Sequence, residues 1–306
     1  MIRAAKGYYD LDMTMADLAR DLGLTRFQVS RLIKDAREAG IVRIEIVPRT
    51  PRRPDLEAAL QRRFGLKDAV VVPAALDGAM TLDAVAQAAG RFMAGLGSQS
   101  LIGVSWGRTM AAVAHRLPPF WADGVEVVLL NGAMNIRSSA PRTNNVAELF
   151  AQAGAGAATL LPVPAIVGKA ETRAALEQDP TIAEVLAMGI EAQTVIFGVG
   201  GMDSGSVLAQ AGFINERELA ALRRKGAVGD VLGRFIDFEG TIVDAALDAR
   251  TIGLDPAACR DKSYAIAVAT GSPKHTAVLA TLKARYANVI VTDEATATFC
   301  LDQSHE

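Results

Sequence analysis

Residues 14–40 read TMADLARDLGLTRFQVSRLIKDAREAG, and this stretch sets the structure of the N-terminal segment. Two helical patterns flank Gly23, the residue type best suited to a turn with positive φ. Thr14 can cap the first helix, and Thr25 opens the second with the Thr-x-x-Gln pattern of a capping box. Two short helices joined by a turn that contains glycine are typical of a helix-turn-helix.

Small and apolar side chains recur where two crossing helices need them. Ala19 leaves room for the second helix, and Val29 and Leu32 are spaced to face back onto the first. Gly40 is the expected C-cap of the second helix. A generic helical hairpin is the alternative, but its surface need not be basic. Residues 1–63 hold 13 Lys and Arg against 9 Asp and Glu, although the whole chain carries a net charge of −2. This excess positive charge favours an anionic partner.

The second helix carries polar side chains at the end that would enter the major groove of DNA. Arginine suits guanine and glutamine suits adenine, because each pair forms two hydrogen bonds. Thr25 is foremost a cap, and Lys34 and Arg37 lie further along, where they either contact phosphate or are solvated. The candidate DNA-binding residues are Thr25, Arg26, Gln28, Ser30, Arg31 and Lys34.

Residues 42–47 alternate apolar and polar side chains, which predicts a strand that could form a wing beside the helices. Residues 48–54 contain three prolines and three arginines, which indicates a semi-rigid linker whose cations could lie near the DNA backbone. We therefore divide the chain into a winged-helix-like DNA-binding domain with its linker at 1–53 and a second domain at 54–306.

Beyond the linker, short apolar runs alternate with helical patterns, which predicts a doubly wound, mostly parallel α/β sheet. Ligands of such sheets bind at the carboxyl ends of the strands. The expected strands are 69–72, 101–104, 125–130, 159–163, 194–199, 265–269 and 289–292. The expected helices are 55–64, 82–96, 145–153, 172–176, 182–188, 216–224, 273–286 and one that starts at 294.

Three loops follow expected strands and are candidates for binding. In the first, Gly107, Arg108 and Thr109 open a helix and could cradle a sugar or phosphate, or the loop could be a tight turn around a core tryptophan. It matches neither a Walker loop nor G-x-G-x-x-G. The second contains Gly200, whose neighbouring glycines serve either ligand approach or packing. The third places Lys274 at a helix start, where an anion would offset its unfavourable interaction with the helix dipole.

Carboxylates gather in residues 226–240. Asp230, Asp237 and Glu239 could accept hydrogen bonds from hydroxyl groups, although Asp230 could instead cap a turn. His115 stands alone on an apolar helix and is interpreted as structural.

Composition excludes several classes of protein. Cys259 and Cys300 cannot form a disulfide framework, and three histidines do not make a rich metal site, so we expect neither a metal nor a cofactor. No signal peptide is evident, and no run of roughly 18 apolar residues could span a membrane. We expect a reduced, cytoplasmic protein.

Several stretches resemble the SorC-type (SorC/DeoR-like) sugar-responsive transcription regulators. They are residues 34–44, 102–109, 226–230, 271–274 and 291–294, in the same order along nearly the whole chain. The resemblance implies an effector domain similar in fold to glucosamine-phosphate deaminase and ribose-phosphate isomerase. It also implies binding of a sugar, polyol or sugar phosphate without turnover, and assembly as a homodimer or homotetramer.

The resemblance also implies particular effector contacts. Gly107, Arg108, Thr109 and Lys274 would touch the ligand, with Asn131 at a neighbouring strand end. The carboxylate contact maps onto Asp237 or Glu239, and Gly200 joins the set from the second loop. Where sugar-phosphate-sensing relatives often have small residues, this chain has Trp106 and Arg108, which leaves open whether the effector is phosphorylated.

We therefore expect a transcription regulator, not an enzyme, whose affinity for a palindromic operator is controlled by a bound carbohydrate. One alternative is a sugar-phosphate isomerase or deaminase-like enzyme that carries a DNA-binding head, but that chemistry needs a positioned carboxylate base, and no Asp/Glu/His cluster spells one out. A DNA-binding protein with an inert body is a further alternative.

Overall fold

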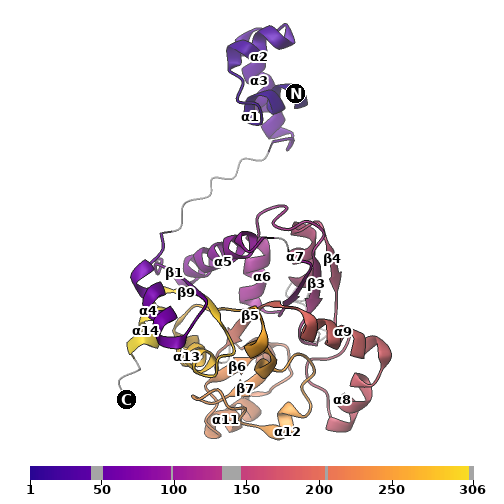
Figure 1. Ribbon diagram of the computed structural model, residues 1–306, viewed down its shortest axis with the longest axis vertical. Helices are drawn as coiled ribbons and strands as arrows, with labels where there is room; N and C mark the ends of the chain where they lie inside the picture. Colours follow the sequence, from indigo (N-terminus) through magenta and orange to yellow (C-terminus); the bar gives the residue numbers. More distant parts are fainter. Residues whose placement is uncertain (43–50, 98, 133–145, 204–205, 303–306) are drawn as a thin grey trace. The chain divides into compact units, whose positions relative to one another are not determined.

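The computed structural model describes residues 1–42, 51–97, 99–132, 146–203 and 206–302. The chain divides into two compact units, which we call the head (residues 1–49) and the body (residues 50–306). Figure 1 shows short helices in the head and a sheet flanked by helices in the body.

The head contains α1 (Ile2–Tyr9), α2 (Met15–Leu22) and α3 (Arg26–Glu38). The Thr14 side chain caps α2 by accepting from the Asp17 amide at 3.2 Å, and Gly23 ends that helix with φ of 65°. Thr25 caps α3 in a capping box with Gln28. The predicted pair of helices and its turn are therefore confirmed.

The core of the head draws on all three helices. Its buried side chains are Ala4, Leu18, Ala19, Val29 and Ile33. Ile33 takes the central position that the sequence analysis gave to Leu32, which packs at the margin of the cluster. Helix α1 was not predicted, because Met1 provides no side-chain cap and the helix is stabilised by packing on α2 and α3.

The linker prediction is corrected at its C-terminal end, whereas residues 43–50, which include the expected wing, lie outside the described residues. Arg52 Nε donates to Glu57 Oε1 at 2.7 Å, and Arg53 Nε lies 3.0 Å from Glu294 Oε1. Pro54 is already the first residue of a helix. These two arginines are held by carboxylates of the body because its first helix and its last helix lie beside them.

The body has one sheet whose seven main strands are all paired in parallel, which confirms the predicted fold class. They lie in the order β1 (Asp68–Val72), β9 (Val289–Asp293), β8 (Tyr264–Val268), β5 (Thr194–Gly200), β2 (Leu101–Val104), β3 (Glu126–Leu129) and β4 (Ala157–Thr159). A hairpin of β6 (Gly229–Val231) and β7 (Arg234–Ile236) pairs antiparallel with the end of β5.

Helices cover both faces of the sheet. On one side, α5 (Gly78–Gly95), α6 (Arg108–His115) and α7 (Val146–Ala153) pack on side chains such as Ile102, Val104 and Ile196. On the other side, α4 (Pro54–Phe64), α9 (Pro180–Glu191), α13 (His275–Lys283) and α14 (Glu294–Asp302) pack on side chains such as Val195 and Phe197. Alternate residues of β5 thus face opposite cores. Helices α4 and α14 lie side by side (Figure 1).

Shorter elements complete the body. They are α8 (Ala170–Glu177), α10 (Val207–Gln210), α11 (Glu216–Arg224), α12 (Ala245–Asp248) and the 3₁₀ helices η1 (Pro256–Asp261) and η2 (Ser272–Lys274).

Some predicted boundaries are wrong. The strand expected at 159–163 is β4 at Ala157–Thr159, because Pro162 and Pro164 lack the amide that a ladder needs; Leu161 and Val163 are buried as irregular chain instead. Helix α5 begins before residue 82, since Asp77 caps it by accepting from the Met80 amide at 2.7 Å. The segment expected as one helix from 273 divides into η2 and α13.

Arg234 is the charged group most fully enclosed in the hairpin, with a side chain 1% exposed. Its Nε donates to Asp248 Oδ1 at 2.7 Å, and its Nη1 donates to the Leu254 carbonyl at 2.9 Å. Its Nη2 donates to the Gly253 carbonyl at 3.2 Å. This arginine connects the β6–β7 hairpin to the last residue of α12 and to the segment that follows that helix.

Both cysteines are free and buried. Cys259 and Cys300 belong to the same hydrophobic cluster of the body, and burial raises the pKa of each thiol to about 12. Thiolates are the reactive form of cysteine, so both side chains are chemically inert at neutral pH.

Within the described residues, no helix has the length and apolar character required to cross a membrane. No group of three or more His, Cys, Asp or Glu residues in the same described part is placed to hold a metal ion.

Candidate functional site

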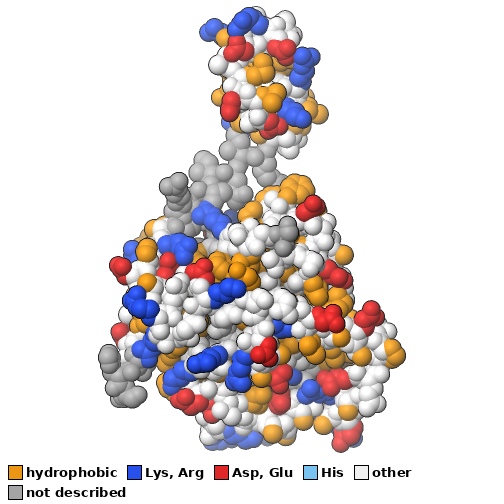
Figure 2. Space-filling model, viewed as in Figure 1, with side chains coloured by type: hydrophobic (Ala, Val, Ile, Leu, Met, Phe, Trp, Pro, Cys, Tyr) orange, Lys and Arg blue, Asp and Glu red, His pale blue; other side chains and the backbone are white. Residues whose placement is uncertain are grey.

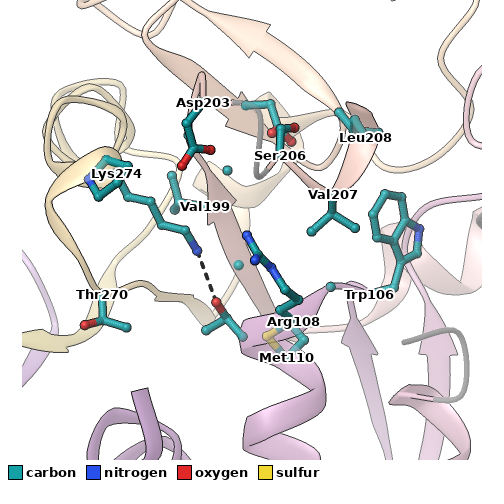
Figure 3. A pocket seen from close by; sticks show the side chains of 17 residues that line it. Trp106, Arg108, Met110, Val199, Asp203, Ser206, Val207, Leu208, Thr270 and Lys274 are labelled. Carbon is teal, nitrogen blue, oxygen red and sulfur yellow. Dashed lines mark hydrogen bonds between the residues drawn. The ribbon is translucent and has the colours of Figure 1, made fainter. Parts of the chain in front are cut away.

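A cavity of about 230 Å³ opens at the carboxyl ends of β2, β5 and β8. It is lined by the loops that follow these three strands, which are the loops expected to bind a ligand. The hairpin strand β6 supplies Asp230 as a fourth contribution. Figure 3 shows the side chains around this space.

The loop after β2 is both a tight turn around a buried tryptophan and part of the cavity wall, the two alternatives that the sequence left open. Trp106 is buried and its Nε1 donates to the Gly132 carbonyl at 2.7 Å, so it is indeed a structural residue. Gly107 has φ of 129° and is the N-cap residue of α6, which places Arg108 and Thr109 in the first turn of the helix at the cavity. The tryptophan anchors the loop and the next residues line the cavity.

The glycines after β5 are required by close packing. A Cβ on Gly200 would lie 1.8 Å from Asp230 Oδ1, and one on Gly201 would lie 2.7 Å from the Pro273 carbonyl oxygen. Both residues also line the cavity. The loop is thus pressed against its neighbours in a way that only glycine permits, and its backbone forms part of the wall.

Lys274 crosses the cavity from the loop after β8. Its Nζ donates to Thr109 Oγ1 at 3.1 Å, and Figure 3 shows its side chain and that of Arg108 reaching into the same space. Burial lowers the pKa of Lys274, and the neighbouring Arg108 lowers it further, whereas Asp230 and Asp203 oppose both effects. The cavity therefore contains a poorly solvated cation beside a second one.

Asp230 is the carboxylate that the hairpin turns into the cavity. Burial raises its pKa from 3.8 to about 6, against the opposing effects of a hydrogen bond from the Gly233 amide and of Lys274. The Gly233 amide donates to its Oδ2 at 3.2 Å. Asp230 thus caps its own turn and also lines the cavity, so both sequence interpretations apply to it.

We predict that Asp230→Asn changes the pH dependence of stability. Because the folded-state pKa is raised, the favourable neutral carboxyl is present below about pH 4 and is lost as the pH rises through about 6. Asparagine is neutral throughout, so at pH 8 the variant should have a free energy of unfolding about 2–3 kcal/mol above that of the unmodified protein, with little difference near pH 4. Urea unfolding at both pH values measures this. Glu148→Gln, on the exposed side of α7, controls for loss of one charge, and a pH-independent difference would contradict the prediction.

The other expected carboxylates are not in this cavity. Asp237 Oδ1 accepts from the amides of Glu239 and Thr241 at 2.9 and 2.8 Å, so it shapes the turn after the hairpin. Glu239 is exposed and pairs with Lys283 at 2.8 Å. Asn131 follows β3, is buried and does not line the cavity, and its Oδ1 has no partner among the described residues. The structure brings together Gly107, Arg108, Thr109, Gly200, Asp230 and Lys274, and adds Asp203.

A second cavity of about 540 Å³ shares a wall with the first. The shared residues are Arg108, Thr109, Thr270 and Lys274. Its other wall includes the segment before α5 together with His275 and Asp293. The two cations therefore border both spaces.

The candidate DNA-binding residues all lie on the exposed surface of α3 or at its cap. Thr25, Arg26, Gln28, Ser30, Arg31 and Lys34 are exposed. Gln28 is partly engaged, because its Oε1 accepts from the Thr25 amide at 2.9 Å. Figure 2 shows hydrophobic, basic and acidic side chains interspersed on one face of the head. Phe27, which is not among the predicted DNA-binding residues, is also exposed on α3.

Comparison with known proteins assigns the family. The sugar-binding domain family Sugar-bind matches residues 50–302, which is nearly all of the body. The chain is a member of the SorC-type family of sugar-binding transcriptional regulators. Over 298 residues it is 33% identical to the deoxyribonucleoside regulator of Bacillus subtilis, covering 97% of this chain and 95% of that protein. It is also 30% identical over 305 residues to the erythritol catabolism regulatory protein EryD of Brucella abortus, covering 99% and 96%.

The crystal structure of the full-length sorbitol operon regulator SorC from Klebsiella pneumoniae resembles this SorC-type regulator along its whole length. The TM-score is 0.77 at 29% sequence identity, with 98% of this chain and 97% of that chain covered. The predicted resemblance is thereby confirmed, and the chain is a DNA-binding transcriptional regulator whose body has the fold of this family.

Proposed function

We propose that the body of this regulator binds a small carbohydrate that carries an anionic group, such as a sugar phosphate, and that this ligand controls operator affinity. The observation that carries the proposal is the pair of cations, Arg108 and Lys274, in one cavity with the carboxylates Asp203 and Asp230. Cations can bind a phosphate or carboxylate group, and carboxylates accept hydrogen bonds from sugar hydroxyls.

The electrostatics of the cavity favour an anionic ligand over a neutral polyol. A lysine whose pKa is lowered by burial is held at a cost, and an anion would compensate for its lost hydration. The volume of about 230 Å³ is smaller than that of usual drug-binding pockets, which suits a small metabolite. Control of DNA affinity then requires that the ligand bind two arrangements of the protein with different affinities.

A thermal-shift series tests the ligand class. The full-length protein is heated with inorganic phosphate, with a panel of pentose, tetrose and hexose phosphates, and with the same sugars and polyols without phosphate. A ligand at a hundredfold excess over its dissociation constant adds about 2.7 kcal/mol of stability, so binding should raise the melting temperature clearly. We expect rises with phosphorylated sugars only. A rise with a neutral polyol alone would contradict the anionic assignment.

We propose that the ligand is bound without chemical change. An enzyme reading has one observation in its favour, because an Asp230 with a pKa near 6 beside Lys274 resembles an acid–base pair. The named relatives are regulators, which supports the sensor instead. Incubation of the protein with each stabilising ligand, followed by NMR of the solution, distinguishes the two. Conversion at a steady rate, proportional to protein concentration, would favour the enzyme.

We propose that the head binds a palindromic operator through α3, as a homodimer or homotetramer in the cytoplasm. A two-fold dimer would place its two reading helices at half-sites about one helical turn apart, or at a multiple of that distance. The capped N-terminus and the exposed basic residues of α3 support this placement.

Arg31→Ala is expected to weaken operator binding by roughly tenfold, since it removes a base contact or a phosphate contact in each half-site. Arg31 is exposed on α3, so the fold of the head and ligand binding by the body should be unchanged. Gel shift at constant salt measures the DNA affinity, and thermal unfolding provides the control. Equal DNA affinity of the two proteins would show that α3 is not the reading helix.

A further inference from the structure

The N-terminal turn of α3 exposes one large aromatic side chain. Phe27 is 80% exposed, more than any other large hydrophobic residue in the described part of the head. A single exposed hydrophobic residue on a protein surface is not unusual by itself. Whether the exposed Phe27 side chain points to a function depends on which face of α3 it occupies and which residues share that face.

Phe27 lies on the side of α3 that faces away from the core of the head. Val29 and Ile33 face the core of the head. With about 3.6 residues per turn, Phe27, Arg31 and Lys34 follow at i, i+4 and i+7 on the side away from that core. One aromatic ring and two cations therefore form a single exposed stripe, with the ring at the N-terminal end.

The capping box holds the first turn of α3 in one conformation. Gln28 Oε1 accepts from the Thr25 amide at 2.9 Å and from Thr25 Oγ1 at 3.0 Å. Glutamine reads adenine by using both its oxygen and its nitrogen, so an oxygen held by the cap disfavours that contact. The capping box therefore makes adenine recognition by Gln28 less favourable than the sequence suggested. The exposed stripe that begins with Phe27 is then the surface of α3 best placed to contact DNA.

We infer that Phe27 contacts the 5-methyl group of a thymine in the major groove and so determines sequence preference at one position of each half-site. This inference rests on the proposal that α3 is the reading helix. The thymine methyl is the apolar group among the base edges of the major groove, and phenylalanine is a side chain that contacts it. Arg31, one turn further along the same stripe, supplies the neighbouring polar or phosphate contact.

Uracil substitution tests the contact, because uracil is thymine without the methyl group. The full-length protein first selects its operator from a random duplex pool. Each thymine of the selected site is then replaced by uracil, in both half-sites at once, and the dissociation constant is measured by fluorescence anisotropy at fixed salt. We expect one symmetric pair of positions at which the unmodified protein loses about fourfold in affinity for each half-site.

The variant Phe27→Ala completes the cycle. It should bind the selected operator roughly fivefold or more weakly and should bind thymine and uracil equally at the sensitive pair. The matched control is Phe120→Ala, which removes a ring that is 82% exposed in the body, and it should keep full sensitivity to uracil. Phe27 lies outside the head core, and thermal unfolding checks that Phe27→Ala remains folded.

The outcomes separate this inference from the function on which it rests. If no sequence is selected, DNA binding by the head fails and the inference fails with it. If an operator is selected but no uracil position matters, or if Phe27→Ala keeps the sensitivity, the thymine contact is wrong while DNA binding stands. If Phe27→Ala weakens all duplexes equally through loss of the oligomer, seen by light scattering, the ring serves assembly and the inference is also overturned.

Discussion

Replacing Lys274 by methionine is expected to weaken the binding of an anionic sugar by roughly 100-fold, because it removes a desolvated charge that would pair with the anion. Methionine keeps most of the length of the side chain and loses only the ammonium group and its hydrogen bond to Thr109. In the variant, Arg108 would still bind the anion, but the second positive charge of Lys274 would be missing. Isothermal titration with the ligand found by thermal shift measures the loss.

The same substitution should also stabilise the unliganded protein. Burial lowers the pKa of Lys274, which means that the folded state disfavours its charged form at neutral pH. The control is Lys283→Met, at the C-terminal end of α13, the helix that follows Lys274, where Lys283 pairs with Glu239 outside the cavity. If Lys274→Met bound the ligand as tightly as Lys283→Met, the anion would not lie at Lys274. Weaker binding in a variant that is no less stable cannot be ascribed to unfolding.

Asp248→Ala is expected to lower the free energy of unfolding by about 3–5 kcal/mol, since it leaves the enclosed Arg234 without its carboxylate. The carbonyl groups that also accept from Arg234 do not neutralise its charge. Denaturation with urea provides the measurement. Glu239→Ala breaks an ion pair whose carboxylate side chain is 70% exposed and should cost below about 1 kcal/mol. Similar losses in the two variants would mean that burial of Arg234 does not matter.

The substitution Asp248→Ala should also affect the cavity, because Arg234 belongs to the hairpin that carries Asp230. Loosening the hairpin should therefore weaken ligand binding in Asp248→Ala even under conditions in which the protein remains folded.

Local signals made much of the fold predictable. Thr14, Gly23 and Thr25 act within one turn of helix, so their caps could be read from neighbouring residues. The loops after the strands were found by a rule of parallel sheets, which placed Arg108 and Lys274 in one cavity although they are far apart in the chain.

The features that were missed depend on distant partners. The strands β6 and β7 have three residues each, too few for a periodic pattern, and they form because the end of β5 offers an edge. Their register turns Asp230 into the cavity and leaves Asp237 beyond the hairpin, which the order of residues could not reveal. Similarly, Arg53 was assigned to a linker because its partner, Glu294, is near the other end of the chain.

The shielded thiols give this regulator a practical advantage for spectroscopy. Because Cys259 and Cys300 lie in the interior as protonated sulfhydryls, maleimide dyes should react with an engineered surface cysteine and spare both native ones. Fluorophores could then be attached to α3 and to the body without first removing any native residue. Energy transfer between the two dyes, recorded with and without effector and operator, would report whether the distance between the head and the body changes when either ligand binds.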